Sequence, residues 1–218
     1  EVFMRSPFDN LSKLRINKLF DLLGVHLYRY NKSEEVLPTI KNENIVCIVM
    51  EGSAQILYIE YNGNEILVEN LYKDSVFGTN ISGTNYDNCE IVAKSEMEVL
   101  VIDYNKLLDS RNLNHPYFNT FLRNLFDITS MKFKERNKRI RILEKKQIRE
   151  KLLEYFEIEY NSNPSKAIYL PFSLKELADY IAVNRSAMFR ELQRLKNDKL
   201  IEVNGRKITL LYKQSLFN

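Results

Sequence analysis

The sequence is poor in cysteine and has no long apolar run. Its two cysteines, Cys47 and Cys89, lie far apart, each in a β-like segment. Two thiols cannot supply the four thiolates of an iron–sulfur cluster, and the chain has neither a CxxC motif nor a His/Cys cluster with zinc spacing. We therefore expect two buried thiols in a reducing cytoplasm. No stretch of about 18 apolar residues occurs, so no transmembrane helix is expected, and Glu1–Asn10 has no signal-peptide pattern.

The chain also lacks the residue patterns on which most enzymes depend. It has no Ser/His/Asp or Cys/His constellation, no HExxH motif, no Walker loop and no glycine-rich dinucleotide turn. Its two histidines, His26 and His115, are isolated, which favours structural roles for both. The adjacent carboxylates Glu34 and Glu35 would point to opposite faces of a strand. We therefore expect no enzymatic activity, no metal site and no cofactor.

What the sequence does have is an asymmetric charge. Residues 1–131 contain 12 Lys/Arg and 18 Asp/Glu, a net charge of −6, whereas residues 132–218 contain 20 and 11, a net charge of +9. A basic half joined to an acidic half indicates that one end of the chain meets a polyanion. Charge alone is equally compatible with a solvated basic face, so the interpretation depends on the local motifs.

The acidic half shows the pattern of a small β domain. A short helix is predicted at Leu11–Leu23, and from about Val25 to Ile102 short runs rich in Val, Ile and Tyr are separated by Gly or Asn. Asn62-Gly63 between two such runs predicts a hairpin with a type I′ turn, in which both central residues have positive φ. Several short strands at near-regular spacing indicate an antiparallel sandwich or barrel. The predicted strands are Ile45–Met50, Ala54–Tyr61, Glu65–Leu71, Glu90–Ala93 and Glu98–Ile102, with a further turn at Gly83-Thr84-Asn85.

A long helix is predicted to follow a short one at Asp103–Ser110. It begins near Pro116, a residue suited to a first helical turn, and continues to Ile142–Leu143. A helix of about 27 residues is roughly 40 Å long, so it either bridges domains or packs against a second copy of the chain. We expect the second copy to cover its apolar stripe, which consists of Phe118, Phe121, Leu122, Leu125 and Ile128.

The basic half carries a helix-turn-helix pattern after an amphipathic helix at Lys145–Tyr160. Ser173-Leu174-Lys175-Glu176 is a capping box, and Asn184 is a good N-cap for a second helix. Helices are predicted at Leu174–Tyr180 and Arg185–Asn197, with the small Ala178 where they cross. The inner face of the second helix is Met188, Leu192 and Leu195, and its outward positions are Arg185, Ser186, Phe189, Arg190, Gln193 and Arg194. The two N–H donors of an arginine side chain match the O6 and N7 atoms that guanine exposes in the major groove better than any other side chain does.

A second hairpin follows the predicted helix-turn-helix. Leu200–Val203 and Arg206–Leu210 flank Asn204-Gly205, an Asn-Gly turn signal. Arg206 and Lys207 would lie at its tip, where they could contact phosphate. A helix-turn-helix with such a hairpin is a winged helix, which favours DNA binding over a helical hairpin used for protein contact.

This layout resembles the Crp/Fnr family of transcription regulators over almost the whole chain. The most specific segment is 183–192, where Arg185 and Arg190 match the two arginines of the family's Arg-Glu-x-x-x-Arg reading helix. Ser186 replaces the Glu of the cyclic-AMP receptor branch, which removes that contact to cytosine. The resemblance implies an α+β chain with an antiparallel β-roll of the cupin-like, cyclic-nucleotide-binding type at 1–115, a dimerisation helix at 116–144 and a winged helix-turn-helix at 145–218. The DNA-binding residues would be Ser173, Asn184, Arg185, Ser186, Phe189, Arg190, Arg194, Arg206 and Lys207.

The predicted sensor domain departs from the family pattern. The family grips cyclic nucleotide with Phe-x-Gly-Glu and a later Arg-Ser-Ala, but here Thr79 replaces the Glu and Asp87 replaces the Arg. A carboxylate facing a phosphate is repulsive, so a cyclic nucleotide is not the expected effector. With only isolated Cys and His residues, haem is not expected either. An effector pocket would lie between roll and long helix, lined by Phe77, Gly78, Thr79, Asp87, Asn88, Leu122 and Leu125.

The resemblance implies a homodimeric transcription regulator that binds a palindromic operator in double-stranded DNA and works with RNA polymerase in the cytoplasm, away from membranes. A second interpretation remains open, in which the β-roll is a ligand-binding module that acts on a protein partner through the helix-turn-helix. Salt-sensitive retention on heparin and specific binding to DNA would separate the two. The effector, the operator sequence and the sign of regulation do not follow from the sequence.

Overall fold

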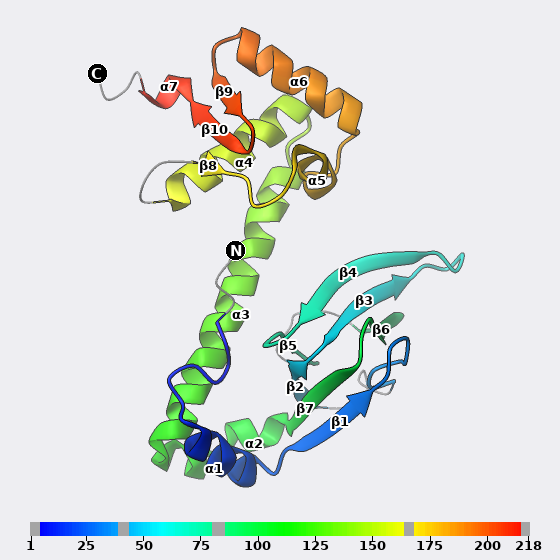
Figure 1. The fold of residues 1–218 in the computed structure, drawn as a ribbon, viewed down its shortest axis with the longest axis vertical. Helices are drawn as coiled ribbons and strands as arrows, with labels where there is room; N and C mark the ends of the chain where they lie inside the picture. The colour runs from blue at the N-terminus through cyan, green and yellow to red at the C-terminus, as the bar shows by residue number, and fades with distance from the viewer. Residues whose placement is uncertain (1–4, 39–43, 80–85, 164–167, 215–218) are drawn as a thin grey trace. The chain divides into compact units, whose positions relative to one another are not determined.

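The computed structural model describes residues 5–38, 44–79, 86–163 and 168–214. Contacts within the chain divide it into two compact units, Val2–Lys132 and Phe133–Asn218. Helix α3 (Pro116–Leu143) is continuous and contributes residues to both units (Figure 1). Antiparallel sheets in the first unit and a helix-turn-helix in the second confirm the predicted α+β fold. The predicted turn at Gly83-Thr84-Asn85 lies outside the described residues.

The first unit is a β-roll with helices on one side. Its elements are α1 (Lys13–Leu23), β1 (His26–Tyr30), β2 (Ile45–Glu51), β3 (Ser53–Ile59), β4 (Glu65–Tyr72), β5 (Val76–Phe77), β6 (Cys89–Ala93), β7 (Met97–Asp103), α2 (Tyr104–Leu108) and a 3-10 helix at Ser110–Asn114. The strands form two antiparallel sheets in the orders β1-β7-β2-β5 and β4-β3-β6. The predicted strands are confirmed to within two residues at each end, whereas no pattern had singled out β1 or β5.

Strand β2 is buried on both faces, which explains its unbroken apolar run. Cys47 and Val49 point into the core between the two sheets, and Val46 and Ile48 point into a second core formed with the helices. A strand with one solvated face would alternate apolar and polar residues. The run Ile45–Val49 therefore records two layers of packing against one strand.

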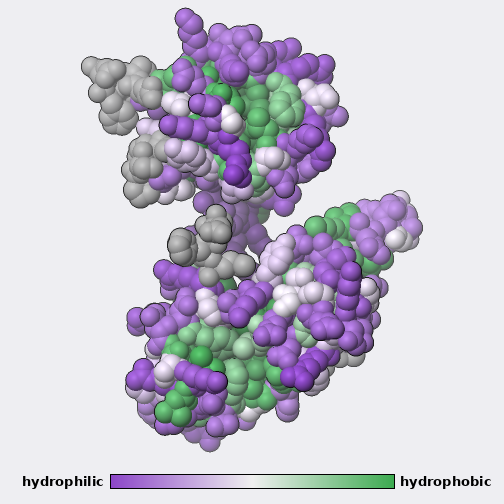
Figure 2. Space-filling model, in the orientation of Figure 1, coloured by the Kyte–Doolittle hydropathy of each residue, from purple (hydrophilic) through white to green (hydrophobic). Residues whose placement is uncertain are grey.

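The hairpin between β3 and β4 differs from the prediction at its turn. Ile59 pairs with Glu65, so five residues form the connection, and only Gly63 has a positive φ, of 83°. A type I′ turn needs positive φ at Asn62 as well, so that prediction is wrong. Beyond the core, Ile66 and Leu67 are exposed on β4, and Figure 2 shows apolar surface near this end of the hairpin.

The apolar stripe at the start of α3 is covered by its own chain. Phe118, Phe121 and Leu125 lie in the second core of the first unit, packed with α1, β2, β5 and β7. The ring of Phe8 stacks on Phe121 at 5.7 Å. The expectation that a second copy covers Phe118, Phe121, Leu122, Leu125 and Ile128 is therefore wrong, because these side chains pack in the core of a single chain.

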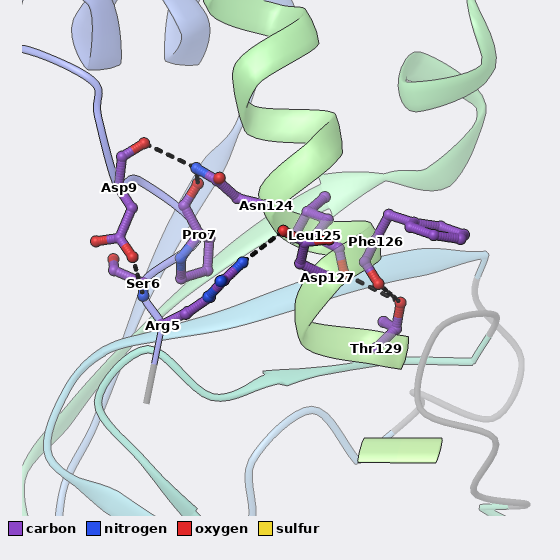
Figure 3. A network of polar contacts seen from close by, with 9 residues as sticks. All are labelled: Arg5, Ser6, Pro7, Asp9, Asn124, Leu125, Phe126, Asp127 and Thr129. Atoms are coloured by element: carbon purple, nitrogen blue, oxygen red, sulfur yellow. Dashed lines mark hydrogen bonds and ion pairs between the residues drawn. The ribbon is translucent and has the colours of Figure 1, made fainter. Parts of the chain in front are cut away.

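A segment preceding α1 is fastened to α3 by polar contacts (Figure 3). The side-chain amide of Asn124 donates to the carbonyls of Pro7 and Asp9, at 3.0 and 2.8 Å. The guanidinium of Arg5 pairs with Asp127 at 2.6 Å. This segment therefore closes the side of α3 that carries Phe121.

The second unit is built on α4 (Ile148–Ser162), which carries the helix-turn-helix and the wing. Its other elements are β8 (Ile168–Tyr169), α5 (Leu174–Tyr180), α6 (Arg185–Asn197), β9 (Ile201–Asn204), β10 (Lys207–Leu210) and α7 (Leu211–Gln214). Strands β8, β10 and β9 form a small antiparallel sheet in that order. Both predicted helices of the helix-turn-helix are confirmed at their stated bounds, while β8 was not predicted.

The turn between α5 and α6 is tight and depends on a residue in the left-handed region. Ala182 has a φ of 52°, its N–H donates to the carbonyl of Asp179, and the N–H of Val183 donates to that of Ala178. These two bonds form a Schellman motif, whose left-handed position is usually glycine. Two cations complete the end of α5: Lys151 donates to the carbonyl of Ile181, and Arg139 to that of Tyr180.

We expect the substitution Ala182→Gly to stabilise the protein. An alanine Cβ in the left-handed region costs about 1–2 kcal/mol, and glycine removes this cost. Glycine also has more freedom in the unfolded chain, which offsets about 0.5–1 kcal/mol of the stabilisation. The free energy of unfolding from urea titration measures the difference. The control is Ala187→Gly, which lies inside α6 and should destabilise by about 1 kcal/mol. Equal destabilisation by both variants would show that Ala182 is not strained.

Candidate nucleic-acid interface

Both helices of the helix-turn-helix begin at side-chain caps, as predicted. The hydroxyl of Ser173 accepts from the Glu176 N–H, and the Glu176 carboxylate accepts from the Ser173 N–H at 2.7 Å. These bonds lower the pKa of Glu176. At the second helix, the side-chain oxygen of Asn184 accepts from the Ala187 N–H at 3.2 Å. The caps fix where each helix starts, and so which residues occupy the first turns of α6.

The inner face of α6 anchors it to the unit. Met188, Leu192 and Leu195 are buried in one core with α4 and α5, and Ala178 is fully buried where the helices cross. An ion pair of 2.7 Å joins Arg149 on α4 to Asp198 just after α6. Helix α6 is therefore held along its length by packing, and its outer face is left for other contacts.

The outer face of α6 is polar, basic and exposed. All six predicted outward residues are accessible, and Phe189 keeps 42% of its surface. The exposed positions are Arg185, Ser186, Phe189, Arg190, Gln193 and Arg194. Ser186 and Phe189 offer a hydroxyl and an apolar ring between the arginines. The face can therefore donate several hydrogen bonds at once to an anionic partner.

The three arginines on this face differ in what holds them. Arg194 pairs with Glu191 at 3.1 Å along the same helix. Arg185 pairs with Asp179 on α5, at 2.7 Å, and this carboxylate raises the pKa of the guanidinium further. Arg190 makes no ion pair with any residue that the structure describes. The sequence pattern found the arginines but not Asp179, whose only signal was its position six residues before Arg185.

The wing follows α6 in the chain, and its turn differs from the prediction. Asn204 pairs with Lys207, so the two central residues are Gly205 and Arg206, and only Gly205 has a positive φ, of 60°. Positive φ at the first central residue alone is the pattern of a type II′ turn. Arg206 is exposed in the turn itself, while Lys207 begins β10 with its ammonium 5.9 Å from the ring centre of Tyr169.

The residues predicted to form an effector pocket in the first unit do not come together. Phe77 is buried in the core between the two sheets, whereas Leu122 and Leu125 pack in the separate core on the other side of β2 and β5. Asp87 and Asn88 are exposed, and Asn88 lines an open depression with Tyr58 and Tyr61. The predicted pocket is therefore wrong as a single site, because one sheet separates its members.

The polar groups of the Phe77–Thr79 segment instead form hydrogen bonds with other parts of the chain. The Gly78 N–H donates to the hydroxyl of buried Tyr86 at 3.1 Å, and the Ile45 N–H donates to the Thr79 hydroxyl at 3.4 Å. A Cβ on Gly78 would lie 2.3 Å from the carbonyl of Ile45, so only glycine fits this close approach.

The cysteines and other ligand-type residues form no further centre in the described ranges. Cys47 is buried, and burial raises the pKa of the Cys89 thiol, with Asp87 adding to the effect. No group of three or more His, Cys, Asp or Glu residues there has the geometry of a metal site. None of the described helices is long and apolar enough to cross a membrane.

Comparisons with known proteins agree with this geometry. Residues 150–217 match the family model of the Crp-like helix-turn-helix domain, and no curated protein matches the chain. Among solved structures, CprK complexed with OCPA is 16% identical with a TM-score of 0.56, covering 89% of this chain and 91% of that one. The Catabolite Activator Protein of Thermus thermophilus is 15% identical with a TM-score of 0.51, covering 94% and 93%.

A CooA mutant from Carboxydothermus hydrogenoformans is 19% identical with a TM-score of 0.51, covering 96% of this chain and 91% of that one. At these identities the structures establish a shared fold, and the family model establishes the kind of C-terminal domain. Residues 150–217 thus form a Crp-like helix-turn-helix domain, and the chain has the fold of the Crp/Fnr transcription regulators.

Proposed function

We propose that this protein is a sequence-specific regulator that binds a palindromic operator as a homodimer. The observation that carries the proposal is the outer face of α6, where Arg185 and Arg190 project from a helix that is capped, buried on its inner side and followed by a basic wing. The N-terminal half of such a helix enters the major groove. The net charge of +9 over residues 132–218 supplies the sequence-independent attraction to phosphate.

The arginines would read guanine, and the wing would contact the backbone. A bidentate arginine contact to the O6 and N7 atoms of guanine discriminates by about 1–3 kcal/mol. Ser186 replaces the glutamate of the cyclic-AMP receptor branch, so the cytosine contact made there is not proposed here. Ser173, Asn184, Phe189, Arg194, Arg206 and Lys207 would position the protein through phosphate, sugar or base-methyl contacts.

The dimer would form along a face of α3 that the first unit leaves uncovered. Phe126, Phe133 and Ile140 recur every seven residues and keep 71%, 66% and 52% of their surface. Leu143 follows three residues after Ile140 and is also exposed. A seven-residue apolar repeat is the signature of helices that pair side by side. A two-fold pair would place two reading helices about 34 Å apart, one turn of DNA, and the bound dimer would act on RNA polymerase.

We expect Phe133→Glu to dissociate the dimer, because it buries a carboxylate in the proposed helix pair. Light scattering at micromolar concentration should give a dimer for the unchanged protein and a monomer for this variant. Lys134→Glu, one residue further and off the repeat, should remain dimeric. Phe121→Ala should instead lower the free energy of unfolding by about 3–5 kcal/mol, because it leaves a cavity inside one chain. A monomeric unchanged protein would contradict the proposal.

The effector, if the β-roll has one, would not be a cyclic nucleotide. Asp87 takes the place of the arginine that pairs with the cyclic phosphate, and a carboxylate there repels a phosphate. The hydroxyl of Tyr86 already accepts the Gly78 N–H inside the roll. We expect cyclic AMP and cyclic GMP to bind no better than millimolar in calorimetry. A micromolar dissociation constant for either nucleotide would overturn this expectation.

Loss of Arg190 and loss of Lys207 should have different effects on DNA binding. After operators have been selected from a random pool, Arg190→Ala should reduce the preference for the selected duplex over a scrambled one. Because a dimer makes the contact in both half-sites, the free energy of discrimination lost per dimer should be about twice that lost per half-site. Lys207→Ala should weaken both duplexes equally and lower the salt slope by about 1 per subunit.

The comparison is made at two salt concentrations. Uniform weakening by both variants would make Arg190 a phosphate contact and move the reading face elsewhere. If neither variant affects binding to DNA, and heparin does not retain the protein in a salt-sensitive way, the helix-turn-helix contacts a protein partner instead.

A further inference from the structure

Arg185 on the reading helix is clamped by a carboxylate from the preceding helix. The Oδ2 atom of Asp179 accepts from Nη2 of Arg185 at 2.7 Å, and Oδ1 accepts from Nε at 3.4 Å. Two parallel bonds of this kind hold the plane of a guanidinium as well as its position. Both side chains keep 57% of their surface, so the pair lies on the outside of the unit.

Stability of the helices does not account for this pair. An exposed ion pair contributes only about 0–1 kcal/mol. In addition, a cation in the first turn of a helix and an anion in the last turn both oppose the helix dipole. Arg185 is the first residue of α6, and Asp179 is the second-last residue of α5, so each charge stands at the unfavourable end of its helix. The pair therefore points to a role outside folding.

The clamp leaves free the edge of Arg185 that a guanine needs. Nε and Nη2 form one side of the guanidinium, and Asp179 occupies that side. The remaining end-on edge consists of Nη1–H and the outward hydrogen of Nη2. Two donors side by side match the O6 and N7 atoms of guanine. A guanidinium already fixed in its plane loses less conformational entropy on binding than one that is free to rotate.

We propose that Asp179 is a specificity-determining positioning residue that holds Arg185 in the orientation that reads a guanine in the major groove. The proposal rests on the proposed function, since it assumes that α6 reads duplex DNA. Asp179 itself touches no base. Its carboxylate also repels nearby phosphates, so it lowers affinity for every sequence while it sharpens the choice of base. Arg190, which has no such clamp among the described residues, provides the internal comparison.

The test measures discrimination at each base position rather than affinity alone. Duplexes with each of the four bases at every position of the selected half-site compete for the unchanged protein and for Asp179→Ala, Asp179→Asn and Arg185→Ala. The position at which Arg185→Ala loses its preference identifies the base under Arg185. At that position, Asp179→Ala should reduce the preference for guanine about five- to tenfold, a part of the arginine's own contribution. Asp179→Asn keeps one acceptor oxygen, so its preference for guanine should lie between those of the unchanged protein and Asp179→Ala.

Three controls separate positioning from charge and from folding. Glu202→Ala removes an equal charge from an exposed site on β9 and should leave the base preference unchanged. In an Arg185→Ala background, Asp179→Ala should have no further effect on preference. At the position read by Arg190, Asp179→Ala should change nothing. Far-UV circular dichroism should show the same unfolding midpoint for Asp179→Ala within a few degrees.

The outcomes that overturn the proposal differ from those that overturn the proposed function. If the unchanged protein selects DNA but Asp179→Ala keeps the full preference for guanine, Asp179 does not position Arg185. If Asp179→Ala binds the selected duplex more tightly with the preference intact or increased, Asp179 masks Arg185 and does not orient it. If the unchanged protein shows no preference among duplexes, the proposed function fails, and this inference fails with it.

Discussion

The packing of α3 is the constraint on which much of the rest depends. Its first turns contribute Phe118, Phe121 and Leu125 to the helical side of the β-roll, and without them the outer face of β2 and β7 would be exposed. A helix buries roughly one stripe against a single neighbouring layer. Once that stripe is committed to the chain's own fold, the remaining apolar positions lie elsewhere on the helix. The separate seven-residue series beginning at Phe126 has no part in that core.

The two apolar faces of α3 explain why the sequence predicted the helix correctly but assigned its apolar stripe to the wrong contact. Periodicity locates apolar side chains on a helix, and it correctly gave α3 its extent from Pro116 to Leu143. It does not say what covers them, and Phe118 and Phe126 look equally apolar. The same difficulty affected the effector pocket. The resemblance to the family's nucleotide-binding motif predicts Phe77 and Leu125 in one pocket, whereas β5 directs neighbouring side chains into opposite cores.

Local chemistry was predicted more reliably than packing. The caps at Ser173 and Asn184 involve residues three apart, so they are visible in the sequence, and the helix-turn-helix bounds followed from them. The turns differ from the prediction in both hairpins. Asn-Gly occurs in both hairpins, yet in each case only the glycine adopts positive φ, because strand pairing shifted the turn by one residue or lengthened it. The Asp179–Arg185 pair was invisible to pattern, since it depends on how α5 and α6 cross.

Within the second unit, the proposed function assigns different roles to the net charge and to the individual arginines. A basic surface draws in any polyanion, and more lysine or arginine would strengthen that attraction without adding sequence information. Specific recognition requires instead that a few donors be held still, and the groups that hold them are acceptors. Carboxylates are the strongest acceptors in the chain, and Glu191 and Asp179 each pair with an arginine on the outer face of α6. The two acids lower the net charge by two. Arg190 has no ion pair with any described residue, so under the proposed function the DNA itself would orient this side chain.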